Sequence, residues 1–225
     1  MTEQQWQGEV WLARDYALFA GRNGDTRAHA HYAHQWVLAM GEPLSLQLDD
    51  QSVSGTRLFI PSLSRHAFHD AQQPMLVLYA EPLAYSEHDI TQALQQLPTT
   101  LPALAACMAG MPRRQLDSRI QRALLSLDEQ LQDKVSAQEL ARTASLSLSQ
   151  LERLFAEQVG LSVRRLVLWR RLYLALRLAL QGSAQTEAAH AAGFADSAHL
   201  SRSMRSLLGI RADLSLPHLR LRLLL

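Results

Sequence analysis

The sequence predicts an α+β protein of two domains, a small N-terminal β-barrel followed by an all-α domain. Three observations lead to this prediction. From Val10 to about Leu83, short apolar runs are separated by turn residues, as in a region of short β-strands. After Ser86 the apolar residues recur with the helical period. Within the helical half, two stretches are similar to each other at a spacing of 49 residues.

The β half contains short apolar runs, "LSLQL", "TRLFIP" and "MLVLYAEP", which are separated by turn residues. Several short strands with such turns are typical of a small barrel. If "HAHYAHQWVLAM" is extended, His29, His31 and Gln35 lie on one face of a strand. Four aromatic residues are expected either to line a ligand pocket inside the barrel or to fill it: Trp36, Phe59, Phe68 and Tyr79.

A short helical segment connects the two halves. One helix is expected around Ile90 and is stopped by Pro98, and a second helix ends near Gly110. The leucines of this segment either form a dimer surface or pack on their own barrel: Leu94, Leu97, Leu101 and Leu104. A boundary near Pro112 gives three predicted domains, 1–85, 86–112 and 113–225.

The C-terminal half contains the repeat. In "SLSQLERLFAEQVG" and "DSAHLSRSMRSLLG", Leu151 aligns with Leu200 and Arg153 with Arg202. The preceding helices align at a spacing of 48, so the second turn is one residue longer. Two helices joined by a tight turn form a helix-turn-helix unit. We expect the two leucines to face inward and the two arginines outward. The alternative is a helical repeat that serves packing or protein recognition.

Charge and helix length favour DNA as the partner of this half. Residues 1–112 hold 5 Arg against 11 acidic residues, whereas residues 113–225 hold 17 Lys and Arg against 10 acidic residues. A basic half suits a polyanion. The segment "VRRLVLWRRLYLALRLALQ" predicts a connecting helix of roughly 28 Å. Such a connector would place two recognition helices in successive major grooves of double-stranded DNA, roughly 34 Å apart.

The repeat resembles the AraC/XylS family of bacterial transcription regulators over about 90 residues. The matching strings run from "VSAQELARTASLSLSQLERLFAEQVGLS" to "EAAHAAGFADSAHLSRSMRSLLGI", in which Gly-Phe followed by Asp and Arg is the most specific signal. "HAHYAHQWVLAMGEPLSL" and "LFIPSLSRHAF" resemble the small cupin-like sensor of that family. The second repeat departs from the family pattern at Ala188-Ala189, at Leu200 and Met204, and at Arg211-Ala212.

The resemblance implies which residues face DNA. The first major groove would meet Ser149, Gln150, Glu152 and Arg153, and the second Ser197, Ala198, His199, Ser201 and Arg202. The two repeated arginines would contact guanine O6 and N7, or else phosphate. Glu152 would accept from a cytosine amine or pair with Arg153. Five further arginines are expected to contact phosphates or to support the fold: Arg164, Arg165, Arg170, Arg171 and Arg205. Trp169 is expected in the core.

The histidines of the β half raise a second hypothesis. His29, His31, Gln35 and His66 resemble the metal ligands of cupins, with Gln35 where an acidic ligand is common. We expect no cofactor, and a divalent metal is the alternative. The competing function is a cupin metal-binding enzyme or metal sensor with a helical appendage. No nucleophile, phosphate-loop or nucleotide motif supports catalysis, so we expect no enzyme.

The whole sequence therefore predicts a sequence-specific DNA-binding transcription regulator, homodimeric and controlled by a small-molecule effector in the β domain. The sequence has no apolar run long enough for a membrane span, no secretory signal and a single cysteine, Cys107, so we expect a cytoplasmic protein without a membrane partner.

Overall fold

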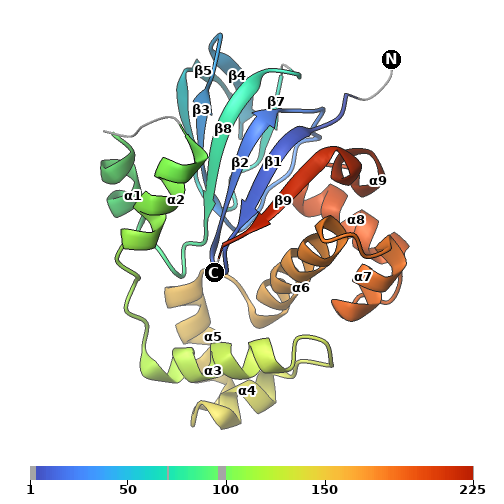
Figure 1. Cartoon of the computed structure of the whole chain (residues 1–225). Coiled ribbons are helices and arrows are strands. Elements are labelled where there is room, and N and C mark those ends of the chain that lie inside the picture. The colour runs from blue at the N-terminus through green and yellow to red at the C-terminus, as the bar shows by residue number, and fades with distance from the viewer. Residues whose placement is uncertain (1–3, 70, 96–99, 225) are drawn as a thin grey trace. The chain divides into compact units, whose positions relative to one another are not determined.

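The computed structural model describes residues 4–69, 71–95 and 100–224. The chain divides into two compact units: residues 1–113 together with 201–225 form the first, and residues 114–200 form the second. The first unit is referred to below as the β unit and the second as the helical unit (Figure 1). The domain boundaries given above stay predictions. In the described part of the chain, no helix combines the length and apolar character that crossing a membrane requires.

The β-rich N-terminal region is confirmed, and its strands form two sheets that face each other. The larger sheet has the order β6-β3-β8-β2-β1-β9, and the smaller one the order β5-β4-β7. The strands are β1 Gln7–Leu12, β2 Tyr16–Arg22, β3 His34–Ala39, β4 Leu44–Leu48, β5 Gln51–Gly55, β6 Arg57–Ile60, β7 His66–Phe68, β8 Pro74–Ala80 and β9 Leu219–Leu223. Neighbouring strands are antiparallel except for the parallel pair β1 and β9.

The core of the β unit lies between the two sheets. Its buried members are Trp6, Phe19, Val37, Leu44, Leu46, Ile60, Phe68, Met75 and Val77, with Tyr79 packed against them. Because side chains alternate along β3, Gln35 and Val37 lie on the core face and Trp36 lies on the opposite face. There the Trp36 ring packs against the Phe59 ring, with centroids 4.9 Å apart, and its Nε1 donates to Thr91 Oγ1 at 3.2 Å. The prediction that these two aromatic residues line or fill the interior is therefore wrong, whereas Phe68 does fill it.

Two short helices of the β unit follow strand β8. They are α1 Glu87–Leu94, capped by the Ser86 hydroxyl, and α2 Leu101–Gly110. The described leucines of this segment are buried: Leu94, Leu101 and Leu104. They pack within their own unit, which is the second of the two alternatives stated for them, and they do not form an exposed surface. Leu97 and Pro98 lie outside the described residues.

The chain ends in a strand that the prediction of an all-α C-terminal domain missed. β9 has the alternating sequence LRLRL and pairs in parallel with β1, beside which it lies in Figure 1. The guanidinium of Arg222 lies 4.2 Å from the centroid of the Trp11 ring, a cation–π arrangement. Pairing with β9 satisfies backbone groups of β1 that an exposed sheet edge would leave open.

The remaining chain is helical, as predicted. Its helices are α3 Ser118–Glu129, α4 Ala137–Thr143, α5 Leu148–Leu154, α6 Val163–Leu180, α7 Gln185–Ala191, α8 Ser197–Leu208 and the short α9 Ala212–Ser215. A π-helical turn, Phe155–Val159, extends α5, and a 3₁₀ turn, Leu216–His218, follows α9. The connecting helix α6 has 18 residues and is therefore about 27 Å long.

Candidate functional site

The first helix-turn-helix unit consists of α4, a tight turn and α5. The turn contains Ser145, whose φ of 56° is in the left-handed region. Its backbone amide donates to Arg142 O at 3.0 Å, and the Leu146 amide donates to Ala141 O at 2.8 Å. A reciprocal capping box then opens α5: the Gln150 amide donates to Ser147 Oγ at 3.2 Å, and the Ser147 amide donates to Gln150 Oε1 at 2.9 Å.

The second helix-turn-helix, formed by α7 and α8, repeats this turn in detail. Gly193 has a φ of 77°, its amide donates to His190 O at 3.0 Å, and the Phe194 amide donates to Ala189 O at 2.9 Å. Each of these residues lies 48 positions after its counterpart in the first turn. The helix that follows begins 49 positions later, so the predicted extra residue in the second turn is confirmed. Asp196 caps α8 by accepting the His199 amide at 2.6 Å, also as predicted.

The aligned leucines and arginines face as predicted. Leu151 and Leu200 are buried, with exposed fractions of 0% and 1%. Arg153 and Arg202 are exposed on the outer faces of α5 and α8. The repeat therefore presents one exposed arginine from each second helix, at matching positions.

The other candidates on α5 are exposed, and two of them have partners within the chain: the Ser149 hydroxyl lies 3.2 Å from Ser147 Oγ, and Gln150 belongs to the capping box. Ser149, Gln150 and Glu152 are all exposed. The Gln150 side chain serves the capping box, and only its amino group remains for another partner. Arg153 forms an ion pair with Glu157 at 3.6 Å, so the predicted pairing of Arg153 with Glu152 is wrong: on a helix, residues four apart are neighbours and adjacent residues are not.

Leu148, the first residue of α5, has an exposed fraction of 40% and was not among the residues predicted to face DNA. It begins the apolar stripe that continues through the buried Leu151 and Phe155, and it stays partly uncovered at the first position of the helix. An apolar residue placed directly after a capping residue, at the start of a helix, is the signal that could have identified it. Apolar side chains contact thymine methyl groups in DNA major grooves.

The candidates on α8 differ in exposure. Ala198 and Arg202 are exposed, and four residues are partly exposed: Ser197, His199, Ser201 and Arg205. The His199 ring lies edge-on against the buried Phe194 ring, with centroids 5.1 Å apart. His199 therefore has a packing partner in the turn.

Two of the predicted arginines of α6 are exposed, and two have partners that support the fold. Arg164 and Arg165 are exposed near its start. Arg170 is buried with Nε 4.0 Å from Asp128 Oδ1, and Arg171 donates to Leu131 O at 2.9 Å and to Asp133 O at 2.6 Å. Arg170 and Arg171 thus connect α6 to the end of α3 and support the fold. Trp169, expected in the core, is half-buried.

The histidine cluster of the β unit is assembled, although the predicted single strand is not. β3 begins at His34, so His31 lies in the segment before it, and His29 forms an isolated bridge with His66. Ring nitrogens of His29, His31 and His66 nevertheless lie within 4.8 Å of one another. Gln35 joins them, with Oε1 3.0 Å from His31 Nε2.

The cluster is buried and uncharged at neutral pH. The exposed fractions of His29, His31 and His66 are 7%, 2% and 1%. Burial, together with the neighbouring rings, lowers the pKa of His29 to about 3 and that of His31 to about 4, and burial lowers the pKa of His66. Neutral imidazoles are the form that can coordinate a metal.

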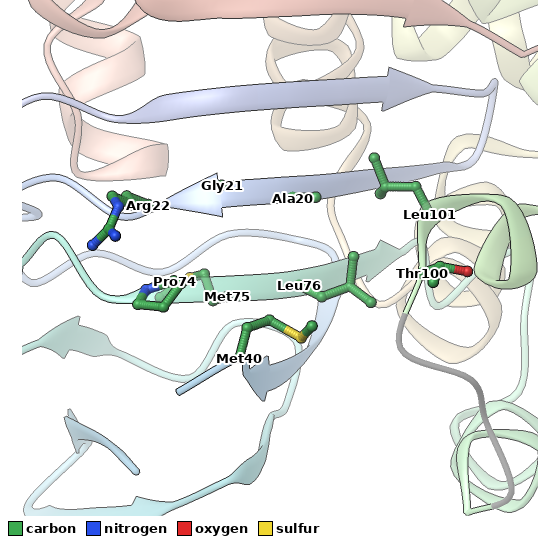
Figure 2. Close-up of a pocket in the computed structure, with 9 residues that line it drawn as sticks. All are labelled: Ala20, Gly21, Arg22, Met40, Pro74, Met75, Leu76, Thr100 and Leu101. Carbon is green, nitrogen blue, oxygen red and sulfur yellow. The ribbon is translucent and has the colours of Figure 1, made fainter. Parts of the chain in front are cut away.

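A separate pocket of about 310 Å³ lies on the outer face of the larger sheet, beside the first residues of α2 (Figure 2). Its lining is mostly apolar and consists of Ala20, Gly21, Arg22, Met40, Pro74, Met75, Leu76, Thr100 and Leu101. It lies on the face opposite to the predicted interior pocket.

Comparisons with known proteins agree with this architecture. Residues 140–213 match the family model described as "Helix-turn-helix domain". The structure of an apo ToxT variant from Vibrio cholerae has a TM-score of 0.60 and 11% identity, over 89% of this chain and 96% of that one. ToxT of Vibrio cholerae bound to an unsaturated fatty acid has a TM-score of 0.57 and 10% identity, over 89% and 95% of the two chains. An AraC-type regulator from Chromobacterium violaceum is 25% identical over 42% of this chain and 85% of that one, with a TM-score of 0.40.

No curated protein sequence is significantly similar to the chain. The family match and the shared two-part fold confirm the predicted resemblance to AraC-type regulators. The chain combines a β-rich N-terminal region with a helix-turn-helix domain of the kind found in DNA-binding transcription regulators.

Proposed function

We propose that this protein is a sequence-specific DNA-binding transcription regulator of the AraC type, which reads one bipartite DNA site with α5 and α8. The observation that carries this proposal is the repeated turn. Two turns with the same hydrogen bonds each precede a helix that exposes an arginine, Arg153 or Arg202, at the matching position. A repeat kept for packing alone would need the buried leucines but not the exposed arginines.

The proposed DNA contacts follow from exposure. Arg153 and Arg202 donate to guanine O6 and N7 in the major groove. Leu148 is the candidate for a thymine methyl group, and Ser149, Glu152, Ser197, Ala198, His199 and Ser201 complete the two helix surfaces. Arg164, Arg165 and Arg205 contact phosphates, which position the helices without reading sequence.

The β unit would carry the control of DNA binding. A small effector bound there would favour one orientation or association state of the helical unit, and thereby change DNA occupancy. The pocket beside α2 supports an effector with an apolar portion, because its lining is mostly apolar. The proposed protein is a cytoplasmic homodimer without catalytic activity, and its dimer surface lies outside the buried leucines of α1 and α2.

Selection of bound sequences from random duplex DNA tests the proposal. The full-length protein should enrich one motif with two parts. Arg153→Ala should weaken binding to that motif roughly 5- to 150-fold at fixed salt, as expected for loss of one bidentate guanine contact of about 1–3 kcal/mol. Binding to unrelated duplex should change little.

Arg14→Ala is the matched control, because it removes the same charge from the β unit. Its side chain is 62% exposed, close to the 65% of Arg153. It should leave the affinity for the motif within about twofold. If Arg153→Ala instead weakens binding to all DNA sequences equally, and lowers the number of ions released on binding by about one, Arg153 is a phosphate contact. If no motif emerges and neither Arg153→Ala nor Arg202→Ala changes affinity, the proposed function is wrong.

A further inference from the structure

The histidine cluster of the β unit has the arrangement of a metal-binding site. Three imidazoles from two parts of the chain converge: His29 and His31 precede β3, and His66 begins β7. The ring centroids of His29 and His66 are 4.2 Å apart, and those of His31 and His66 are 4.9 Å apart. Buried polar rings need partners, so the contacts of each ring nitrogen decide what this cluster can bind.

Backbone carbonyls orient all three rings in the same way. Nδ1 of His29 lies 2.8 Å from Arg27 O, Nδ1 of His31 lies 2.9 Å from Ala33 O, and Nδ1 of His66 lies 3.0 Å from Ser64 O. A carbonyl oxygen can only accept, so Nδ1 carries the proton in each neutral ring. The lone pair of every ring is therefore on Nε2. Metal-bound histidines are held in this way, with the second ring nitrogen donating to a carbonyl.

The surroundings of the Nε2 atoms differ from those of the Nδ1 atoms. Nε2 of His66 is buried without a hydrogen-bond partner among the described residues. Nε2 of His31 faces Gln35 Oε1 at 3.0 Å, which brings two acceptors together. A cation between these two atoms removes the repulsion, and so does an amide turned to present its NH₂ group. The first solution also satisfies His66, whereas the second does not.

We propose that His29, His31 and His66 bind one divalent transition-metal ion through their Nε2 atoms, with Gln35 Oε1 as the fourth protein ligand. Three imidazoles and one amide oxygen form a neutral set of nitrogen and oxygen donors, which suits Zn²⁺ and its neighbours Co²⁺ and Ni²⁺ and disfavours Ca²⁺ and Mg²⁺. The proposal does not depend on the proposed DNA-binding function.

The segment after α8 closes the site on one side. The Arg27 amide donates to Gly209 O at 3.0 Å, and a Cβ atom on Gly209 would lie 2.5 Å from His29 Nδ1. Gly209 also has a φ of 68°, so a side chain at this position is disfavoured twice. Gly209→Ala should therefore displace the His29 ring and weaken metal binding while all four ligands are retained.

Metal binding to the full-length protein tests the proposal directly. Protein freed of metal with a chelator and dialysed should bind one equivalent of Zn²⁺ in a calorimetric titration. Bound Co²⁺ should show the intensified visible absorption of a site with four or five ligands. His66→Ala should lower the Zn²⁺ affinity at least tenfold, and Gly209→Ala should lower it as well.

His69→Ala is the control, because His69 is an exposed histidine directly after the same strand. It should bind Zn²⁺ as the unaltered protein does. A urea unfolding midpoint measured in chelator shows which variants are folded. If His66→Ala does not fold, His31→Gln, which keeps the size of the side chain, replaces it in the test. Absence of stoichiometric Zn²⁺ binding by the unaltered protein overturns the proposal and favours the turned amide of Gln35. Equal loss of affinity in the His66 and His69 variants overturns it too.

Discussion

Gly193, in the turn between α7 and α8, meets two separate demands, and Gly193→Ala should reveal both. Its φ of 77° is unfavourable for any residue with a Cβ atom. A Cβ atom would also lie 2.8 Å from Nε and 2.9 Å from Cζ of Arg171. That guanidinium cannot simply move away, because it donates to Leu131 O and Asp133 O at the end of α3.

Gly160, at the end of the π-helical turn, separates the two effects. Its φ of 78° matches that of Gly193, but an added Cβ atom meets nothing within 4 Å. Gly160→Ala should therefore cost only the backbone strain, about 1 kcal/mol after the gain from a less flexible unfolded chain. Gly193→Ala should cost this amount plus about 1–3 kcal/mol for displacing the hydrogen bonds of Arg171. The lower part of that range applies because the guanidinium is partly exposed to water.

Urea unfolding followed by far-ultraviolet circular dichroism measures these differences. Arg171→Ala completes a double-mutant cycle: in its background, Gly193→Ala should cost no more than Gly160→Ala. The expected coupling free energy between positions 171 and 193 is in the lower part of the same range of about 1–3 kcal/mol. Equal costs for the two glycine substitutions, together with additivity in the cycle, would refute the role given to Arg171.

Three further predictions concern other parts of the chain. Gln150→Ala should lower the free energy of unfolding by about 0.5–1 kcal/mol through loss of the capping box, and Ser149→Ala by less; the reverse order in urea unfolding would contradict this. In metal-free protein, burial lowers the pKa of His29 to about 3, so the unfolded chain takes up its proton first on acidification. Stability should be full above about pH 6.5 and decrease from there towards about pH 3, and a flat urea midpoint in chelator would count against the buried cluster. Arg222→Ala should cost about 0.5–1 kcal/mol and change the fluorescence of Trp11, and an unchanged protein would argue against their cation–π contact.

Local sequence signals predicted most of the helical half. Hydroxyl and carboxylate caps, left-handed turn residues and apolar stripes act over a few residues, so they can be identified without tertiary structure. The bounds expected for α8, about 197 to 208, are those observed. The repeat added information that one helix-turn-helix would not, because equivalent positions such as Arg153 and Arg202 support each other.

Features that depend on distant partners were harder to predict. β9 exists through its pairing with β1, more than 200 residues earlier, and its leucine-rich sequence alone was equally compatible with helix. The face of the sheet on which Trp36 and Phe59 lie depends on where β3 and β6 begin. The period of the apolar residues does not determine these starting points. The histidines were grouped correctly for an incomplete reason: a bend before His34, and not a continuous strand, brings His31 to His66.

The two recognition helices should differ in how freely they can meet DNA. Arg153 is held only by the exposed pair with Glu157, and such surface pairs contribute about 0–1 kcal/mol, so a base or phosphate can replace the partner easily. His199 must leave the Phe194 ring to reach a base, and an aromatic contact of this kind is worth about 0.5–1.5 kcal/mol. His199→Ala should therefore weaken binding to the selected motif less than Arg153→Ala, in fluorescence anisotropy titrations at one salt concentration. A larger loss for His199→Ala would mean that this ring turns away from Phe194 in the complex and that the second helix contributes more than the first.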